Sequence, residues 1–185
     1  MWWMRGLQRT NYMKNQSFTY RKLKPQDAES YLNLQTQIAK ETTHTNLIKG
    51  KPSQNLDQVK NRFAYALKDK TILHLGVFDE KKIIGYLNFK VTHPDHPWLK
   101  HTAQFGMYIL KKYWGLGIGK ELLKHQEKYA RKIKVTRIEA MVRAANKRGV
   151  SLYQKMGFEI EGTRKNAALI GKKYVDEYYI GKILD

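Results

Sequence analysis

Hydrophobic residues recur along the chain at two different spacings, which predicts a succession of strands and helices. A short alternating run at Thr19–Leu23 is typical of a strand. Pro25 suits the first turn of a helix, and a second helix is predicted after the polar loop 43–55. The stripe of the first helix consists of Ala28, Tyr31, Leu32, Gln35, Ile38 and Ala39, and that of the second of Leu56, Val59, Phe63 and Leu67.

The middle and the C-terminal part of the chain are rich in β-forming residues. Runs 71–78 and 82–91 are separated by three polar residues, which indicates a hairpin. The remaining predicted elements are a strand at 101–110, an amphipathic helix through Leu122–Ile133, a strand at 137–142, a helix at 146–156 and strands at 158–166 and 173–184. This order predicts a mixed α/β (α+β) fold. We expect residues 18–185 to form a single domain and residues 1–17 to be a flexible N-terminal extension.

A glycine run lies between the predicted strand 101–110 and the helix that follows it. Residues 113–123 read YWGLGIGKELL, with glycines at 115, 117 and 119. The unpaired N–H groups of a first helical turn, together with the helix dipole, make such a junction an anion site. Lys120 adds a positive charge. The alternative is that the glycines only let strand and helix pack closely; we favour phosphate binding.

Two familiar phosphate-binding loops do not fit this run. A P-loop needs four residues between its first glycine and the Gly-Lys pair, whereas three separate Gly115 from Gly119, and Glu121 stands where a hydroxyl residue belongs. A dinucleotide-binding loop needs a glycine three residues after Gly117, where the chain has Lys120. The run is therefore neither a nucleoside-triphosphate loop nor a dinucleotide-binding loop.

Composition narrows the class of protein. The chain has 35 Lys and Arg against 16 Asp and Glu, a formal net charge of +19, which attracts polyanions such as nucleic acid or ribosomes, although a solvated basic surface explains it equally well. It has no cysteine, which removes disulfides and thiolate chemistry and fits a reducing cytoplasm. No stretch is apolar enough to span a membrane, and the N-terminus lacks the apolar core of a signal peptide.

The glycine run resembles motif A of the GNAT acetyltransferases, whose pattern is [Gln/Arg]-x-x-Gly-x-[Gly/Ala]. That pattern falls here at Trp114, Gly117 and Gly119, so the usual Arg or Gln is a tryptophan. Residues 142–165, VRAANKRGVSLYQKMGFEIEGTRK, resemble the second cofactor-binding segment of the same superfamily. The resemblance implies a mixed, mostly antiparallel sheet of six or seven strands flanked by four helices.

The resemblance also implies a cofactor, acetyl-CoA, with its pyrophosphate on the motif A turn and its pantetheine arm beside the end of strand 101–110. The residues implied to contact it are Ile109, Leu110, Trp114, Gly115, Leu116, Gly117, Ile118, Gly119, Lys120, Asn146 and Tyr153. Asn146 serves equally well as a plain helix N-cap.

The resemblance assigns Tyr153 as the general acid that protonates the CoA thiolate; its alternative is core packing, because its neighbours have helical spacing. The general base is open. Gln104 stands where many relatives carry a glutamate and cannot accept a proton, so Glu41 or a chain of waters is expected to act instead. His93 and His96 flank a proline-broken loop, and we expect no metal site there.

The leading functional hypothesis is an N-acetyltransferase that transfers the acetyl group directly to an amine of a small molecule or a protein. The alternatives are a CoA-binding sensor without catalysis and a basic module bound to RNA or the ribosome. The C-terminal strands are a candidate surface for a homodimer. The acceptor is not readable from the sequence.

Overall fold

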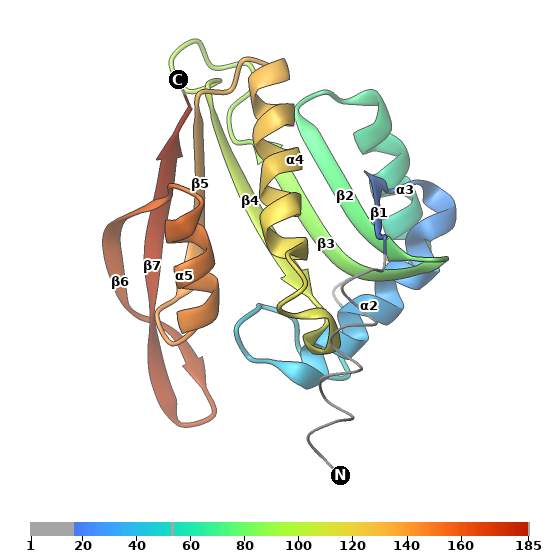
Figure 1. The fold of residues 1–185 in the computed structure, drawn as a ribbon, viewed down its shortest axis with the longest axis horizontal. Helices are drawn as coiled ribbons and strands as arrows, with labels where there is room; N and C mark the ends of the chain where they lie inside the picture. Colours follow the sequence, from blue (N-terminus) through green and yellow to red (C-terminus); the bar gives the residue numbers. More distant parts are fainter. Residues whose placement is uncertain (1–16, 53, 185) are drawn as a thin grey trace.

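The computed structural model describes residues 17–52 and 54–184 and confirms the predicted order of elements (Figure 1). Of the expected extension 1–17, all but residue 17 lies outside the described residues. The strands, helices and 3-10 turns are β1 (Thr19–Lys22), η1 (Pro25–Asp27), α2 (Ala28–Glu41), α3 (Leu56–Lys68), β2 (Ile72–Asp79), β3 (Lys82–Val91), β4 (Thr102–Ile109), η2 (Lys111–Tyr113), α4 (Ile118–Lys132), β5 (Arg137–Arg143), α5 (Lys147–Lys155), β6 (Glu159–Ile170) and β7 (Lys173–Ile183).

The strands form one seven-stranded sheet in the order β1-β2-β3-β4-β5-β7-β6. Every neighbouring pair is antiparallel except β4 and β5, which are parallel. That parallel pairing covers only Thr102–Gln104 against Arg137–Glu139. Beyond Gln104 the two strands diverge, as Figure 1 shows, so the sheet splits at its centre.

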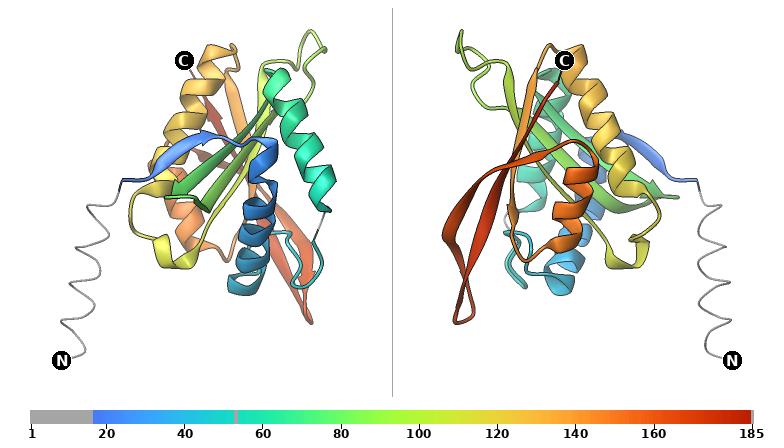
Figure 2. Two further views of the ribbon diagram at one scale, coloured as in Figure 1. Left: turned by 90° about the vertical axis from the view of Figure 1, so that its right-hand side faces the viewer. Right: turned by 60° about the vertical axis from the view of Figure 1, so that its left-hand side comes forward.

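The helices lie on both faces of the sheet (Figure 2). Helices α2 and α3 cover one face of β2 and β3, and α4 lies on the opposite face. Because both of its faces are covered, β3 has a nearly continuous buried run rather than alternation; Ile84, Leu87 and Phe89 are fully buried there. The core therefore lies on both sides of the N-terminal half of the sheet.

Two details differ from the sequence prediction. The buried face of α3 is Val59, Phe63 and Ala66, whereas Leu56 and Leu67 are 38% and 44% exposed because they lie at the rim of the apolar stripe. Strand β6 extends to Ile170 rather than ending near residue 166. The pairing of β6 with β7 is interrupted between Arg164 and Ala168, and this irregularity hid the second half of the strand.

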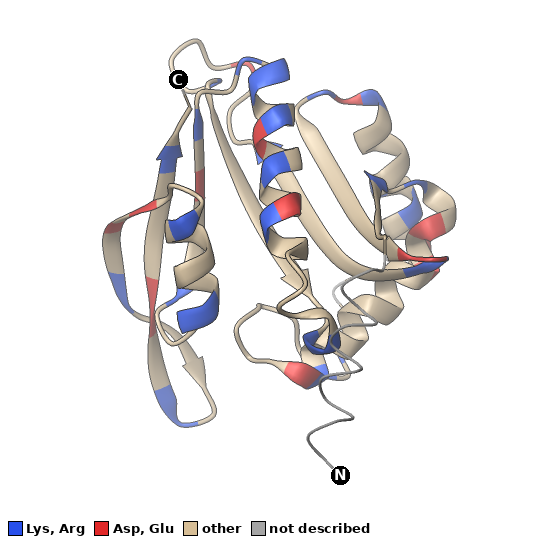
Figure 3. Ribbon diagram, in the orientation of Figure 1, with Lys and Arg blue, Asp and Glu red and all other residues tan. Residues whose placement is uncertain are grey.

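Basic residues are distributed over most elements, with a row of lysines and arginines along α4 (Figure 3). No helix of the described residues is long and apolar enough to cross a membrane.

Candidate active site

The divergence of β4 and β5 is accompanied by two cavities at the centre of the molecule. The first, of about 400 Å³, is lined by the glycine run and by residues of α5. The second, of about 610 Å³, is lined by α2, α3 and residues from β2 to β7. Residues that line both cavities are His44, Thr45, Met107, Tyr108, Asn146 and Tyr153. The shared walls make this a two-chamber site.

The glycine run forms the start of α4 as predicted, but its three glycines serve different purposes. Gly115 and Gly117 have φ of +83° and +80°, a conformation that strains other residues. A Cβ on either would meet nothing within 4 Å, whereas a Cβ on Gly119 would come within 2.7 Å of the Leu152 side chain. The packing alternative therefore accounts for Gly119, and backbone conformation accounts for the other two.

The N-terminus of α4 has free donors. Gly117 is the N-cap and provides no side chain, and the first intrahelical bond is donated by Glu121. Among the described residues, no partner accepts from the N–H groups of residues 118–120. These groups line the first cavity together with Lys120, Arg148 and Lys155. The arrangement suits a phosphorylated ligand.

Trp114, the departure from the family pattern, anchors the turn instead of offering a charge. Its Nε1 donates to the carbonyl of Ile109 at 2.8 Å. The guanidinium of Arg148, at the start of α5, lies 4.9 Å from the centroid of the Trp114 ring and lines the same cavity. Arg148 thus brings a positive charge to the site from another helix. The sequence analysis gave Arg148 no role, although it lies within the quoted segment 142–165.

Leu110 does not have the position expected of a cofactor contact. Its N–H donates to Ile84 and its carbonyl accepts from Tyr113, so both backbone groups are used, and its side chain is buried. Since backbone groups alternate along a strand, those of Met107 and Ile109 face away from β3, toward the diverging β5. Both residues also line the first cavity. The strand edge open to a cofactor is therefore formed by Met107 and Ile109, and not by Ile109 and Leu110 as expected from the sequence.

Tyr153 lies at the junction of the two cavities. Its ring packs edge-on against Phe105 and Phe158, with centroids 5.6 and 5.8 Å away. Burial raises the pKa of its phenol, so the hydroxyl stays protonated at neutral pH. Both readings from the sequence are thus compatible, because the ring packs in an aromatic cluster while the residue lines both cavities.

Asn146 caps α5, as one of the two readings predicted. Its Oδ1 accepts from the Gly149 N–H at 3.0 Å. The same residue lines both cavities, so the cap and a ligand contact do not exclude each other.

Glu41 and Gln104, the two residues considered for the general base, do not line the second cavity. The carboxylate of Glu41 accepts from the Lys111 N–H at 2.7 Å and lines only the first cavity. Gln104 donates to Glu139 where β4 and β5 still pair, and it lines neither cavity. Among the described residues no cluster of three or more metal-ligating side chains occurs, and His93 and His96 lie in an exposed loop.

The second cavity contains a polar network that no motif predicted. Gln35 and Tyr108 both donate to the Tyr31 hydroxyl, at 2.8 and 3.1 Å, and Tyr86 hydrogen-bonds His74 Nδ1 at 2.6 Å. Burial, and then the charge of Arg62, lower the pKa of His74 to about 4, so the imidazole is neutral near pH 7.

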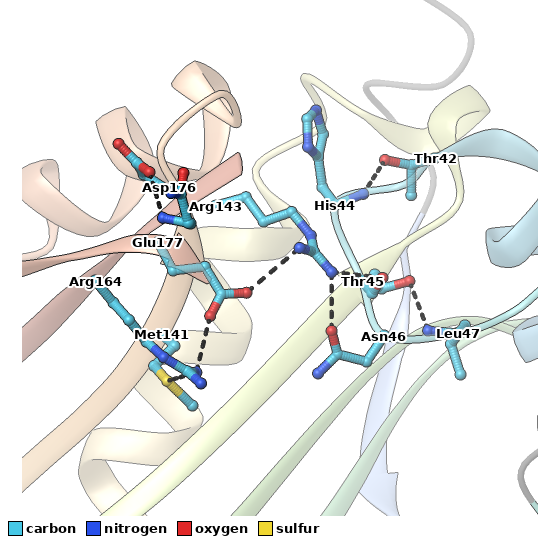
Figure 4. A network of polar contacts seen from close by, with 11 residues as sticks. Thr42, His44, Thr45, Asn46, Leu47, Met141, Arg143, Arg164, Asp176 and Glu177 are labelled. Atoms are coloured by element: carbon cyan, nitrogen blue, oxygen red, sulfur yellow. Dashed lines mark hydrogen bonds and ion pairs between the residues drawn. The ribbon is translucent and has the colours of Figure 1, made fainter. Parts of the chain in front are cut away.

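Arg143 crosses the split in the sheet (Figure 4). From the end of β5 it donates to Asn46 Oδ1 at 2.9 Å and faces Glu177 at 3.5 Å. Glu177 also lies 3.5 Å from Arg164. The loop after α2, which carries Asn46, is thereby connected to β5 and β7.

Comparisons with known proteins agree with this geometry. The family model of the Acetyltransferase (GNAT) family matches residues 37–158. The L-amino acid N-acetyltransferase AaaT of Escherichia coli is 33% identical over 55% of this chain, and the chain spans only 62% of that relative's length. The spermidine N(1)-acetyltransferase of Thermoplasma acidophilum is 28% identical over 64% of this chain and 70% of its own.

A solved structure shows the same fold. The GNAT-family acetyltransferase from Streptococcus pneumoniae superposes with a TM-score of 0.85 at 25% identity and covers 91% of this chain and 100% of its own. The family match takes in most of the two-chamber site, including the glycine run and Tyr153. The chain therefore belongs to the GNAT acetyltransferase family.

Proposed function

We propose that this protein is an acetyl-CoA-dependent N-acetyltransferase that transfers the acetyl group directly to an amine. The observation that carries the proposal is the two-chamber site. A phosphate-binding turn lines one chamber, a polar cavity forms the other, and a protonated tyrosine lies at their junction. A transferase for two substrates requires this kind of connection.

The residues of the first cavity fit acetyl-CoA. The free N–H groups of residues 118–120, Lys120 and Arg148 would hold the pyrophosphate, because a helix start and two cations complement its charge. The backbone of Met107 and Ile109 would hold the pantetheine arm as an added strand. When bound, acetyl-CoA supplies the activated acetyl thioester.

The other groups of this chain organise the transfer. N–H groups at the β4 edge would polarise the acetyl carbonyl. Tyr153 holds a proton on its hydroxyl at neutral pH and would deliver it to the departing thiolate. The chain has no cysteine to carry the acetyl group, which supports direct transfer to the amine.

The acceptor amine must lose a proton. Glu41 faces the first cavity and holds Lys111, and Glu177 lies between two arginines. The sequence left Glu41 or a chain of waters as the general base. Because the Glu41 carboxylate already accepts from the Lys111 N–H, we favour water as the base and assign Glu41 to holding the motif A turn.

The sequence supports two further parts of the proposal. The absence of cysteine suits a reducing cytoplasm, and residues 18–185 would form the single catalytic domain. A homodimer remains a prediction that sedimentation of the purified chain would test.

Calorimetric titration with acetyl-CoA tests the cofactor half of the proposal. We expect one site per chain, with competition by CoA. The matched variant Lys120→Gln, which removes one cation from the turn, should bind more weakly. Absence of acetyl-CoA binding by the folded protein would refute the proposed function.

A further inference from the structure

The second cavity has an excess of positive charge. Its lining includes three arginines, Arg62, Arg143 and Arg164, and one carboxylate, Glu177. Glu177 faces both Arg143 and Arg164, each at 3.5 Å. Three arginines against one carboxylate leave two uncompensated positive charges in the cavity, which repel a polycation and attract an anion.

The uncompensated charge is accompanied by unused hydrogen-bond donors. Five buried side-chain nitrogens or oxygens of the described residues have no hydrogen-bond partner, and four of them belong to Arg62 and Arg143. Buried polar groups are nearly always paired, and an unpaired buried charge is especially unfavourable. The two arginines that have these unpaired nitrogens line the same cavity.

Arg62 is the less compensated of the two. Arg143 is 6% exposed, but it faces Glu177 and donates to Asn46. Arg62 donates through Nη1 to Gln54 and packs over the rings of Tyr31 and Phe63, at 5.1 and 5.2 Å from their centroids. Among residues 17–52 and 54–184, no carboxylate lies within ion-pair distance of Arg62.

The unused atoms of Arg62 are a matched pair. Nε and Nη2 form one edge of the guanidinium, and both lack partners, whereas Nη1 is occupied by Gln54. Two parallel N–H groups on one edge match the two oxygens of a carboxylate. In Arg143 the two nitrogens without a hydrogen bond are Nε and Nη1, which do not share that edge, and Nη1 already faces Glu177.

We propose that the acceptor of this enzyme is an amine that also carries a carboxylate, as a free amino acid does, and that Arg62 binds that carboxylate. The proposal rests on the proposed function, because it specifies the second substrate of that site. Both unused nitrogens are covered by neighbouring atoms, so binding includes a turn of the Arg62 side chain toward the cavity that it lines. Arg143 and Arg164 strengthen the preference for an anion.

A matched panel of acceptors tests the substrate class. Acetyl transfer is followed by release of CoA thiol for several L-amino acids, for the amide of each, for spermidine and for a short peptide with an amidated C-terminus. We expect kcat/KM for the amino acids to exceed that for their amides by about tenfold or more, since only the carboxylate differs. Equal or better turnover of the amides, spermidine or the peptide would overturn the inference and leave the proposed function intact.

Variants of Arg62 test the residue. Arg62→Gln should lower kcat/KM about 10- to 100-fold for the amino acids and less than about twofold for the amides. Arg62→Lys keeps the charge but lacks the two parallel N–H groups, so its kcat/KM for the amino acids should lie between those of the wild type and Arg62→Gln. Arg131→Gln, on the surface of α4, is the matched control and should change neither. An equal loss for acids and amides in Arg62→Gln and Arg62→Lys, both with wild-type thermal unfolding, would assign Arg62 to structure alone and overturn its role.

Binding separates this inference from the function itself. Calorimetric titration of the CoA-bound protein with an amino acid and with its amide needs no turnover. Tighter binding of the acid, lost in Arg62→Gln, supports the carboxylate site even if no amine is acetylated. Absence of that preference in binding and in turnover contradicts it.

Discussion

At the scale of single residues, Tyr153 is the side chain on which the proposed chemistry depends most. It lies where the two cavities meet, and burial keeps its phenol protonated. The sequence resemblance assigned its role, but only the structure shows that the residue lines both cavities. A proton donor at this junction is within reach of a leaving group from one chamber and an acceptor in the other.

Tyr153→Phe should lower kcat about 10- to 100-fold while the affinity for acetyl-CoA stays within about twofold, because the ring packing is kept and only the hydroxyl is lost. Steady-state kinetics and calorimetry measure the two effects. Tyr174→Phe, an exposed tyrosine of β7, is the control. Unchanged kcat in Tyr153→Phe would reassign Tyr153 to packing.

His74 provides a residue-scale prediction about stability. Its folded pKa of about 4 lies below the ordinary histidine pKa of 6.5, so the unfolded chain binds more protons between these values. Stability is therefore complete above about pH 6.5 and falls as the pH decreases toward 4, by up to about 3 kcal/mol.

Urea unfolding of the wild type and of His74→Gln between pH 4 and 7 measures this dependence. The variant should lose most of the slope that His74 contributes, although its stability at pH 7 falls through the lost contact with Tyr86. Parallel pH profiles for the two proteins would contradict the assignment.

At the scale of elements, the hydrophobic periodicity of the sequence predicted the fold, but it predicted only part of the site. Strands and helices such as β3 and α4 have long, strongly patterned apolar faces, which predict them well. The second half of β6 was missed because Asn166, with φ of +51°, lies in an interruption of the pairing. The arginines Arg62, Arg143 and Arg164 belong to α3, β5 and β6 and line the same cavity only in the folded chain, so no local pattern could predict their meeting.

Glu41 connects two elements, since it ends α2 and its carboxylate holds the first residue of η2. Glu41→Gln retains an oxygen acceptor for the Lys111 N–H and should leave acetyl-CoA affinity within about twofold. Glu41→Ala removes the acceptor and should weaken affinity by about three- to tenfold. Calorimetry measures both. A large loss of kcat in Glu41→Gln with unchanged cofactor affinity would instead restore Glu41 as the general base.

Gly119 sets the distance between α4 and α5. Gly119→Ala places a methyl group about where the Leu152 side chain lies, so we expect the free energy of unfolding to fall by about 1–3 kcal/mol. Gly119→Ala combined with Leu152→Val should recover part of the loss, because the shorter side chain makes room. Thermal and urea unfolding test this. Additive losses in the double variant would contradict a direct clash.

At the scale of the whole molecule, the split sheet explains how one domain accommodates two substrates. The parallel pairing of β4 with β5 ends at Gln104, and both cavities are lined by β4 residues beyond that point. The family and its fold were predictable because the glycine run and the Tyr153 segment are local in sequence. The acceptor was not, because its cavity is lined by residues of α2, α3 and six strands, β2 to β7.

The most direct test of the central claim is turnover itself. The purified chain is incubated with acetyl-CoA and a panel of amines, and both CoA thiol and the acetylated amine are quantified. We predict that the two products appear in equal amounts, with an amino acid as the preferred acceptor. Release of CoA without any acetylated amine, or no release despite cofactor binding, would contradict the account of this protein as an N-acetyltransferase.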